Sequence, residues 1–347
     1  MKKVIIVLVL LSMLGIPAYA EDLTAPTVPQ QGQDLMPQEP QSFGEGLLYV
    51  VREAVKKLEP EISAGCGICA CVIATSMVIS VFGGMPGGSS KVTQLAGTVA
   101  VACLLLGSTN TLIRSASDTV MTLSEYGKLL LPVMAAAMAA QGGVTGAASI
   151  YAGTAVFDAV VCSLISKLLV PLVYVFLALA IASSAIGENL LKKLKEFLSW
   201  LVSWSLKTVL YVFTGYITVT GVVSGATDQA ALKAAKLTIS GMVPVVGGIL
   251  SDASEAVLVS AGIVKNAAGI YGLLAVAAVA IGPFLRIGVQ YLLLKLTAAV
   301  CGVFTPGRIC DLIGDFSSAM GVLLAMTGAV CVILFLSTVL FLKGVSG

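Results

Sequence analysis

The residues best placed to do chemistry are a group of cysteines and a few isolated charges within long apolar runs. Cys66, Cys69 and Cys71 lie in the run GCGICAC, the one place in the chain with the spacing of metal ligands. No histidine and no second cysteine cluster accompanies them. Packing of an apolar helix is therefore favoured over a metal or redox role for these thiols.

Four charged residues lie within apolar surroundings. Each charge costs about 3 kcal/mol at the centre of a membrane helix, so a charge in this position is a functional candidate by default. The candidates for intramembrane polar sites are Asp158, Asp252, Arg286 and Lys295.

Familiar catalytic patterns are incomplete. An aspartyl intramembrane protease needs Gly-x-Gly-Asp, but Leu312 precedes the pair Gly314-Asp315 where the first glycine should stand. A rhomboid-like serine protease needs histidine, which the chain lacks, and no nucleotide-binding P-loop is present. The sequence thus predicts neither an enzyme nor a bound cofactor.

The composition identifies the environment of the chain. Its 347 residues are 58% hydrophobic and only 11% charged, and the mean hydropathy is +1.01. A soluble domain carries about 25% charged residues. The fold class predicted is therefore an all-α polytopic membrane protein whose main partner is the lipid bilayer. The net charge of +2 gives no support to nucleic-acid binding.

The N-terminal third divides into segments of different character. Two lysines, a short apolar run and an Ala-Tyr-Ala site predict a cleavable signal peptide at residues 1–20. Residues 21–42 are rich in proline and glutamine and are expected to form a disordered extracytoplasmic tether. An amphipathic extracytoplasmic helix is predicted at 43–63, either resting on the bilayer or binding a partner. The polytopic domain then covers 64–343.

Within that domain, apolar spans alternate with amphipathic pieces. Interfacial helices are predicted at 107–128, with a stripe at Leu112, Ala116, Val120 and Leu123, and at 187–207, with a stripe at Leu190, Leu194, Phe197 and Leu201. Lys192 to Lys195 and the only two tryptophans, Trp200 and Trp204, indicate the cytoplasmic surface. The expected spans lie near residues 64–82, 92–106, 168–186, 209–223, 284–304 and 317–342.

A glycine-rich break interrupts the apolar stretch LLPVMAAAMAAQGGVTGAASIYAG. The break favours a re-entrant hairpin made of a short helix at 129–140 and a second helix from about Val144. An ordinary tight surface loop is the alternative. Small residues allow close approach of other helices or another subunit. The residues expected to form this structural and assembly contact are Gln141, Gly142, Gly143, Thr145 and Gly146.

Two halves of the domain share an order of features. The separation between Pro132 and Pro171 recurs between Pro244 and Pro283, with a displacement of 112 residues. This spacing suggests an internal duplication of about 129–225 and 241–342, with both copies in the same orientation.

The stretch LLPVMAAAMAAQGGVTGAAS and the overall layout resemble the stage III sporulation protein AE family of endospore-forming bacteria, over about residues 43–343. The resemblance implies a component of a trans-envelope channel, or "feeding tube", from mother cell to forespore that is needed for forespore development. It implies the mother-cell membrane around the forespore as its location. The implied partners are the other proteins of the stage III sporulation A operon and a forespore membrane protein. Homo-oligomerisation is expected as well, while a secondary transporter with a broken-helix fold and a structural anchor for partner proteins remain alternatives.

Overall fold

The computed structural model describes residues 26–37, 42–83, 90–140, 144–186, 189–223, 267–304 and 307–345. Every regular element within these ranges is a helix. Six helical stretches are long and apolar enough to cross a membrane, which confirms the predicted all-α polytopic class.

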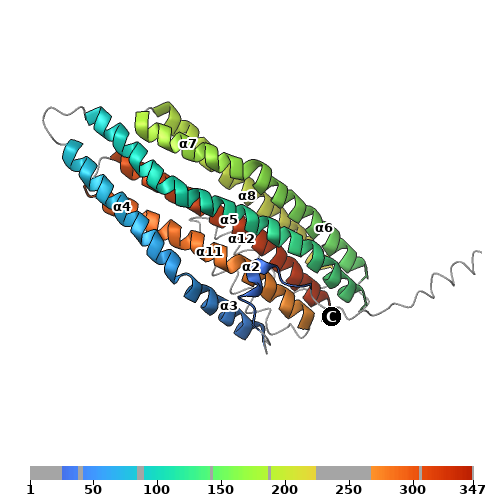
Figure 1. Cartoon of the computed structure of the whole chain (residues 1–347). Helices are drawn as coiled ribbons and strands as arrows, with labels where there is room; N and C mark the ends of the chain where they lie inside the picture. The colour runs from blue at the N-terminus through green and yellow to red at the C-terminus, as the bar shows by residue number, and fades with distance from the viewer. Residues whose placement is uncertain are drawn as a thin grey trace, which may run out of the picture.

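The six stretches form a bundle of long, roughly antiparallel rods (Figure 1). They are α4 (Glu59–Gly83), α5 (Ser90–Ala140), α6 (Val144–Leu164) continuing through the π-helix η1 (Ile165–Leu169) into α7 (Val170–Ile186), α8 (Asn189–Val223), α11 (Ala267–Cys301) and α12 (Gly307–Val345). We call the end where α4, α7 and α11 finish the α4–α5 end. The opposite end, where α5 finishes and α6 begins, is the α5–α6 end.

The helices are longer than the sequence pattern suggested. The predicted interfacial helices at 107–128 and 187–207 are not separate elements, because both are continuous with their neighbouring spans in α5 and α8. The short helix expected at 129–140 is likewise wrong, since it is the last part of the 51-residue α5. At 1.5 Å per residue, α5 is about 76 Å long, more than twice the thickness of a bilayer hydrocarbon core.

Polar residues do not break these helices because the bundle and the helix itself satisfy them. Thr111 and Thr119 donate hydrogen bonds to carbonyl oxygens four residues earlier in α5. The predicted stripe of α5 is largely right, since Ala116, Val120 and Leu123 are buried. In α8 the predicted stripe is wrong: Leu194 and Phe197 are exposed, and the buried face consists of Leu198, Val202, Leu206 and Leu210.

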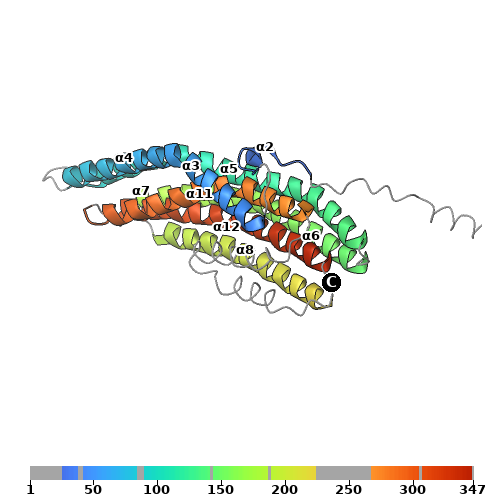
Figure 2. The same cartoon turned by 90° about the horizontal axis from the view of Figure 1, so that it is seen from below.

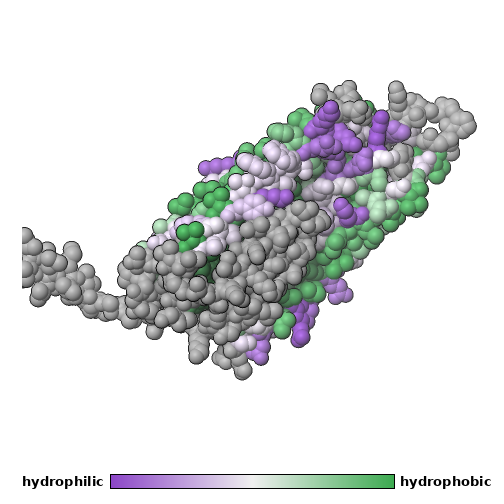
Figure 3. Space-filling model, turned by 180° about the vertical axis from the view of Figure 1, so that it is seen from behind, coloured by the Kyte–Doolittle hydropathy of each residue, from purple (hydrophilic) through white to green (hydrophobic). Residues whose placement is uncertain are grey.

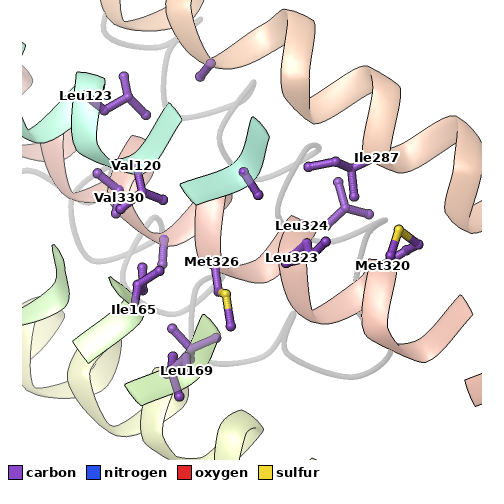
Figure 4. Packing of buried hydrophobic residues seen from close by; sticks show 14 of the residues in the cluster. Val120, Leu123, Ile165, Leu169, Ile287, Met320, Leu323, Leu324, Met326 and Val330 are labelled. Atoms are coloured by element: carbon purple, nitrogen blue, oxygen red, sulfur yellow. The ribbon is translucent and has the colours of Figure 1, made fainter. Parts of the chain in front are cut away.

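α12 lies at the centre of the bundle. It packs against α5, α6, α7, α8 and α11. In Figure 4, Met320, Leu323, Leu324, Met326 and Val330 of α12 lie among side chains from α5, η1 and α11. This central position explains why α12 is apolar around nearly its whole circumference beyond Asp315, as expected of a helix enclosed by protein.

The N-terminal segments pack on α11. Residues 26–37 include the short helix α2 (Gln30–Gln33), and a Cβ on Gly32 would lie 3.0 Å from the backbone nitrogen of Val279. The disordered tether predicted for 21–42 is therefore wrong for this part. Figure 2 shows α2 and α3 beside α11.

The amphipathic helix α3 (Phe43–Lys57) is capped by Ser42, whose Oγ accepts a hydrogen bond from the Glu45 N–H. Val50 and Ala54 pack with Ala278 of α11. Val55, in contrast, is exposed. α3 thus rests on its own chain along its buried face, and neither the bilayer nor a partner protein is needed to cover that face.

The proposed duplication is not shown by the structure. Residues 224–266, which contain Pro244 and the first part of the second copy, lie outside the described residues. What the two regions share in the structure is a proline within a helix, Pro171 in α7 and Pro283 in α11.

Candidate functional site

A small group of polar side chains lies inside the apolar bundle where α5, α6 and α12 meet. Ser124 donates a 2.6 Å hydrogen bond from Oγ to Oδ2 of Asp158. One turn away on α6, Thr154 donates from Oγ1 to Oγ of Ser337 at 3.0 Å. Asp158 is 3% exposed, and its Oδ1 has no hydrogen-bond partner among the described residues. The predicted intramembrane aspartate is thus a buried contact between helices.

Removing the Asp158 side chain should cost more than neutralising it. Asp158→Asn keeps an oxygen that accepts from Ser124, so we expect nearly wild-type stability. Asp158→Ala leaves that donor unpaired and should destabilise the protein by about 1–3 kcal/mol. The measurement is the thermal unfolding midpoint in detergent, with the exposed Asp118→Ala as control. Equal losses for asparagine and alanine would contradict this account, because the charge rather than the hydrogen bond would then matter.

The other three charged candidates are not brought to this place. Arg286 of α11 forms a 2.5 Å ion pair with Glu61 of α4, and both side chains are partly exposed. Lys295 is exposed on α11. Asp252 lies outside the described residues. The four candidates therefore do not form one site. Between Arg286 and Lys295, α11 contains the buried Gln290.

A second buried charge contact escaped sequence reasoning. Lys195 of α8 donates a 2.6 Å hydrogen bond from Nζ to Oδ2 of Asp315 on α12, and their side chains are only 12% and 14% exposed. The only sequence signal was charges of opposite sign 120 residues apart, Lys195 in the run KKLKE and Asp315 in the run DLIGD. Opposite signs do not identify partners without the topology of the bundle.

The three clustered cysteines point to different surroundings. Cys69 is buried, while Cys66 and Cys71 are exposed. Among the described residues no three cysteine or acidic side chains are grouped so that they could hold a metal ion. The spacing in GCGICAC therefore places the thiols around α4 rather than on one ligand-binding face.

The described residues form a helical bundle that is held together by apolar packing and by a few hydrogen bonds and ion pairs between helices. It contains long apolar rods, a central helix and buried polar contacts, and it joins segments that lie far apart in the sequence. The profile of the family described as stage III sporulation protein AE matches residues 44–344. The chain belongs to the stage III sporulation protein AE family. The match extends over nearly all of the chain that follows residue 43.

Among curated proteins, the chain is similar to the stage III sporulation protein AE of Bacillus subtilis (strain 168). The two are 25% identical over 256 residues, which cover 74% of this chain and 64% of the relative. The chain thus aligns with less than two thirds of the relative's length. No solved structure matches the chain.

The glycine-rich break lies inside the region matched to the sporulation family. Gln141, Gly142 and Gly143 are outside the described residues, and Thr145 and Gly146 belong to the first turn of α6, where side chains are not described. The structure shows that the break joins two long helices that pack against each other. Its role in assembly therefore stays a prediction.

Proposed function

We propose that the chain is the membrane component of a trans-envelope channel or secretion complex between mother cell and forespore, and that forespore development requires it. The membership in a sporulation family carries this proposal. Further support comes from the described residues, in which six helices are long and apolar enough to cross a membrane, as in a multi-pass membrane protein. In this proposal that membrane is the mother-cell membrane around the forespore.

The partners in this proposal are the other proteins of the stage III sporulation A operon, a forespore membrane protein and further copies of the chain. Support comes from the form of the described bundle. Its long helices leave exposed apolar side chains along their length, which are available for assembly. We assign the assembly contact to Gln141, Gly142, Gly143, Thr145 and Gly146.

The glycine break gives the direct test. Gly143→Leu should abolish spore formation and co-purification with operon proteins, because the site needs close backbone approach and φ angles that glycine reaches easily. Membrane levels should stay normal, since leucine makes the segment more apolar. Gly107→Leu is the matched control: Gly107 is exposed on α5, and a Cβ there has no neighbour within 4 Å.

Wild-type spore counts and intact complexes for Gly143→Leu would contradict the proposal that the glycine-rich break forms an assembly contact. The wider proposal has its own test, the purification of the tagged wild-type protein from sporulating cells. A monomer that carries no sporulation protein with it would contradict a channel or secretion complex.

A secondary transporter is the second candidate function, and the buried Asp158 with its unpartnered Oδ1 is the observation that favours it. An ion-coupled transporter would need the ionisable carboxyl group there. Asp158→Asn should then abolish function in a folded protein, whereas the channel proposal expects normal spores from this variant.

A further inference from the structure

The contacts between helices fix which residues share one height along the bundle. On antiparallel α5 and α11, a Cβ on Gly272 would touch Leu130. Arg114 lies 16 residues from Leu130 toward the α4–α5 end, and Arg286 lies 14 residues from Gly272 in the same direction. At 1.5 Å per residue, their heights differ by about 3 Å. Glu61 joins them through its ion pair with Arg286.

Two more contacts extend this level to η1 and α8. The first is the hydrogen bond between Ser124 of α5 and Asp158 of α6. Toward the α4–α5 end, Arg114 lies ten residues from Ser124, and Lys167 lies nine residues from Asp158. The second is the contact between the rings of Phe157 in α6 and Phe213 in α8, whose centroids are 5.3 Å apart. Toward the same end, Lys167 lies ten residues from Phe157, and Trp204 lies nine residues from Phe213.

One level thus contains a polar or aromatic side chain from each of the five outer rods. We call this set the mid-height ring: Glu61, Arg114, Lys167, Trp204 and Arg286. All but the half-buried Glu61 are exposed. Trp204 stacks on Trp200 at a centroid distance of 6.0 Å, and both indoles are more than half exposed.

The side chains of the mid-height ring fit the headgroup layer of a bilayer better than its hydrocarbon core. Lipid hydrocarbon cannot solvate exposed guanidinium and ammonium groups, whereas phosphate headgroups bind them. Tryptophan is enriched at the same depth, because its ring is apolar and its N–H is polar. We propose that the mid-height ring lies in the headgroup layer of the bilayer, with anionic phospholipids as its partner. Only half of the bundle's length then spans the membrane.

The half toward the α4–α5 end is the one that the bilayer covers. Most of the exposed large apolar side chains of the described residues lie there, among them Val81, Val92, Val99, Val175, Leu292 and Leu296. From Glu61 to Gly83 and from Ser90 to Arg114 the helices are about 33–36 Å long. This length matches a hydrocarbon core of about 30 Å.

This half also contains exposed charged side chains on α8 and α11. Figure 3 shows hydrophilic side chains gathered near one end of the bundle on the back face. Lys192 and Lys193 are exposed in the first turns of α8, and Lys295 is exposed about 14 Å beyond Arg286. The stems of Lys192 and Lys193, about 16–18 Å beyond Trp204, extend their ammonium groups toward the far surface. Lys295 and the exposed Glu196 lie nearer mid-depth and need a partner protein beside them. Lys195 is neutralised by Asp315.

In the other half, which projects from the membrane, α11 is enclosed by protein. Each residue of α11 from Gly272 to Ala280 is buried, and α2 and α3 pack beside it. α5 continues 26 residues past Arg114 to Ala140, so the projection is about 39 Å tall. The glycine-rich break follows at its tip, on the side opposite Lys192 and Lys193, which the positive-inside rule places in the cytoplasm. The tryptophans, expected from the sequence at the cytoplasmic surface, lie at the opposite headgroup layer in this proposal.

The two tryptophans report the depth of the ring directly, because the chain has no others. The full-length protein is reconstituted in vesicles of phosphatidylcholine and phosphatidylglycerol. The vesicles carry lipids whose acyl chains are brominated either near the carbonyl end or near the methyl end. We expect quenching at least about twofold stronger from the carbonyl-end label, as an interfacial position requires. Stronger quenching from the methyl-end label, or none from either, would overturn the proposal.

A labelling experiment identifies the half that is covered. Single cysteines replace Val99 in the covered half and Val156 in the projecting half, both exposed apolar positions. The background has Cys66, Cys71 and Cys103, the three exposed native cysteines, replaced by serine. The reagent is an impermeant maleimide, applied to sealed vesicles of each orientation, inside-out and right-side-out. Position 156 should react in the one orientation that exposes the projecting half, whereas position 99 should react only after detergent is added. The reverse pattern, or equal reactivity at both, contradicts the assignment. This inference rests on the membrane location alone and survives if the channel role fails.

Discussion

Lys195→Ala is expected to destabilise the protein by about 3 kcal/mol or more, because it leaves the Asp315 carboxylate unpaired in the bundle. Asp315→Ala should cost less. The lysine stem is long enough to carry its ammonium group toward solvent, whereas the aspartate side chain is too short to do so. The thermal unfolding midpoint in detergent, followed by Trp200 and Trp204 fluorescence, measures both losses.

A double variant separates a true pair from two independent effects. Lys195→Met with Asp315→Leu removes both charges and fills similar volumes, so it should recover much of the stability lost by either single change. The exposed pair Lys56–Glu53 is the control, and Lys56→Ala should change the stability by less than about 1 kcal/mol. Additive losses in the double variant would show that the two residues do not stabilise each other.

The sequence predicted the class of the fold better than the lengths of its helices. Hydropathy located the apolar runs because a bilayer demands them. It divided α5 and α8 wrongly because polar stretches were assigned to the membrane surface. In the structure such stretches bury one face on a neighbouring helix, and their hydroxyl groups bond to the preceding turn, as Thr119 does.

The candidate site shows the same limit at the level of single residues. Apolar surroundings marked Asp158 as a candidate for an intramembrane polar site, because its setting within α6 is local information, and the structure shows that its side chain is buried. Its partner Ser124 and the Arg286–Glu61 pair join different helices. Such pairings depend on the rotation and register of packed rods, which one sequence without the fold does not specify.

A projecting half would connect the structure with the proposed function. The membrane-covered half would anchor the chain, and the opposite half would carry the glycine-rich break about 39 Å from the headgroups. The break would then meet partner proteins in the aqueous space rather than at bilayer depth. Gly143→Leu and the labelling of position 156 test these two steps separately.

Gly153→Leu should separate α6 from α8, because a Cβ at Gly153 would overlap the ring of Tyr216. Tyr216 donates a 2.6 Å hydrogen bond from its hydroxyl to the carbonyl oxygen of Ser149, so the ring cannot turn away without losing that bond. Overpacking at a helix contact costs about 1–3 kcal/mol, and loss of the hydrogen bond adds about 1 kcal/mol. The unfolding midpoint should fall accordingly.

The matched control for Gly153→Leu lies on the facing helix. A Cβ at Gly215, beside Tyr216, has no neighbour within 4 Å, so Gly215→Leu should be tolerated. Tyr216→Ala removes the obstructing ring, and the double variant Gly153→Leu with Tyr216→Ala should therefore be more stable than Gly153→Leu alone. If Gly153→Leu and Gly215→Leu behave alike, or if removing the ring gives no recovery, the α6–α8 contact does not depend on the missing side chain at Gly153.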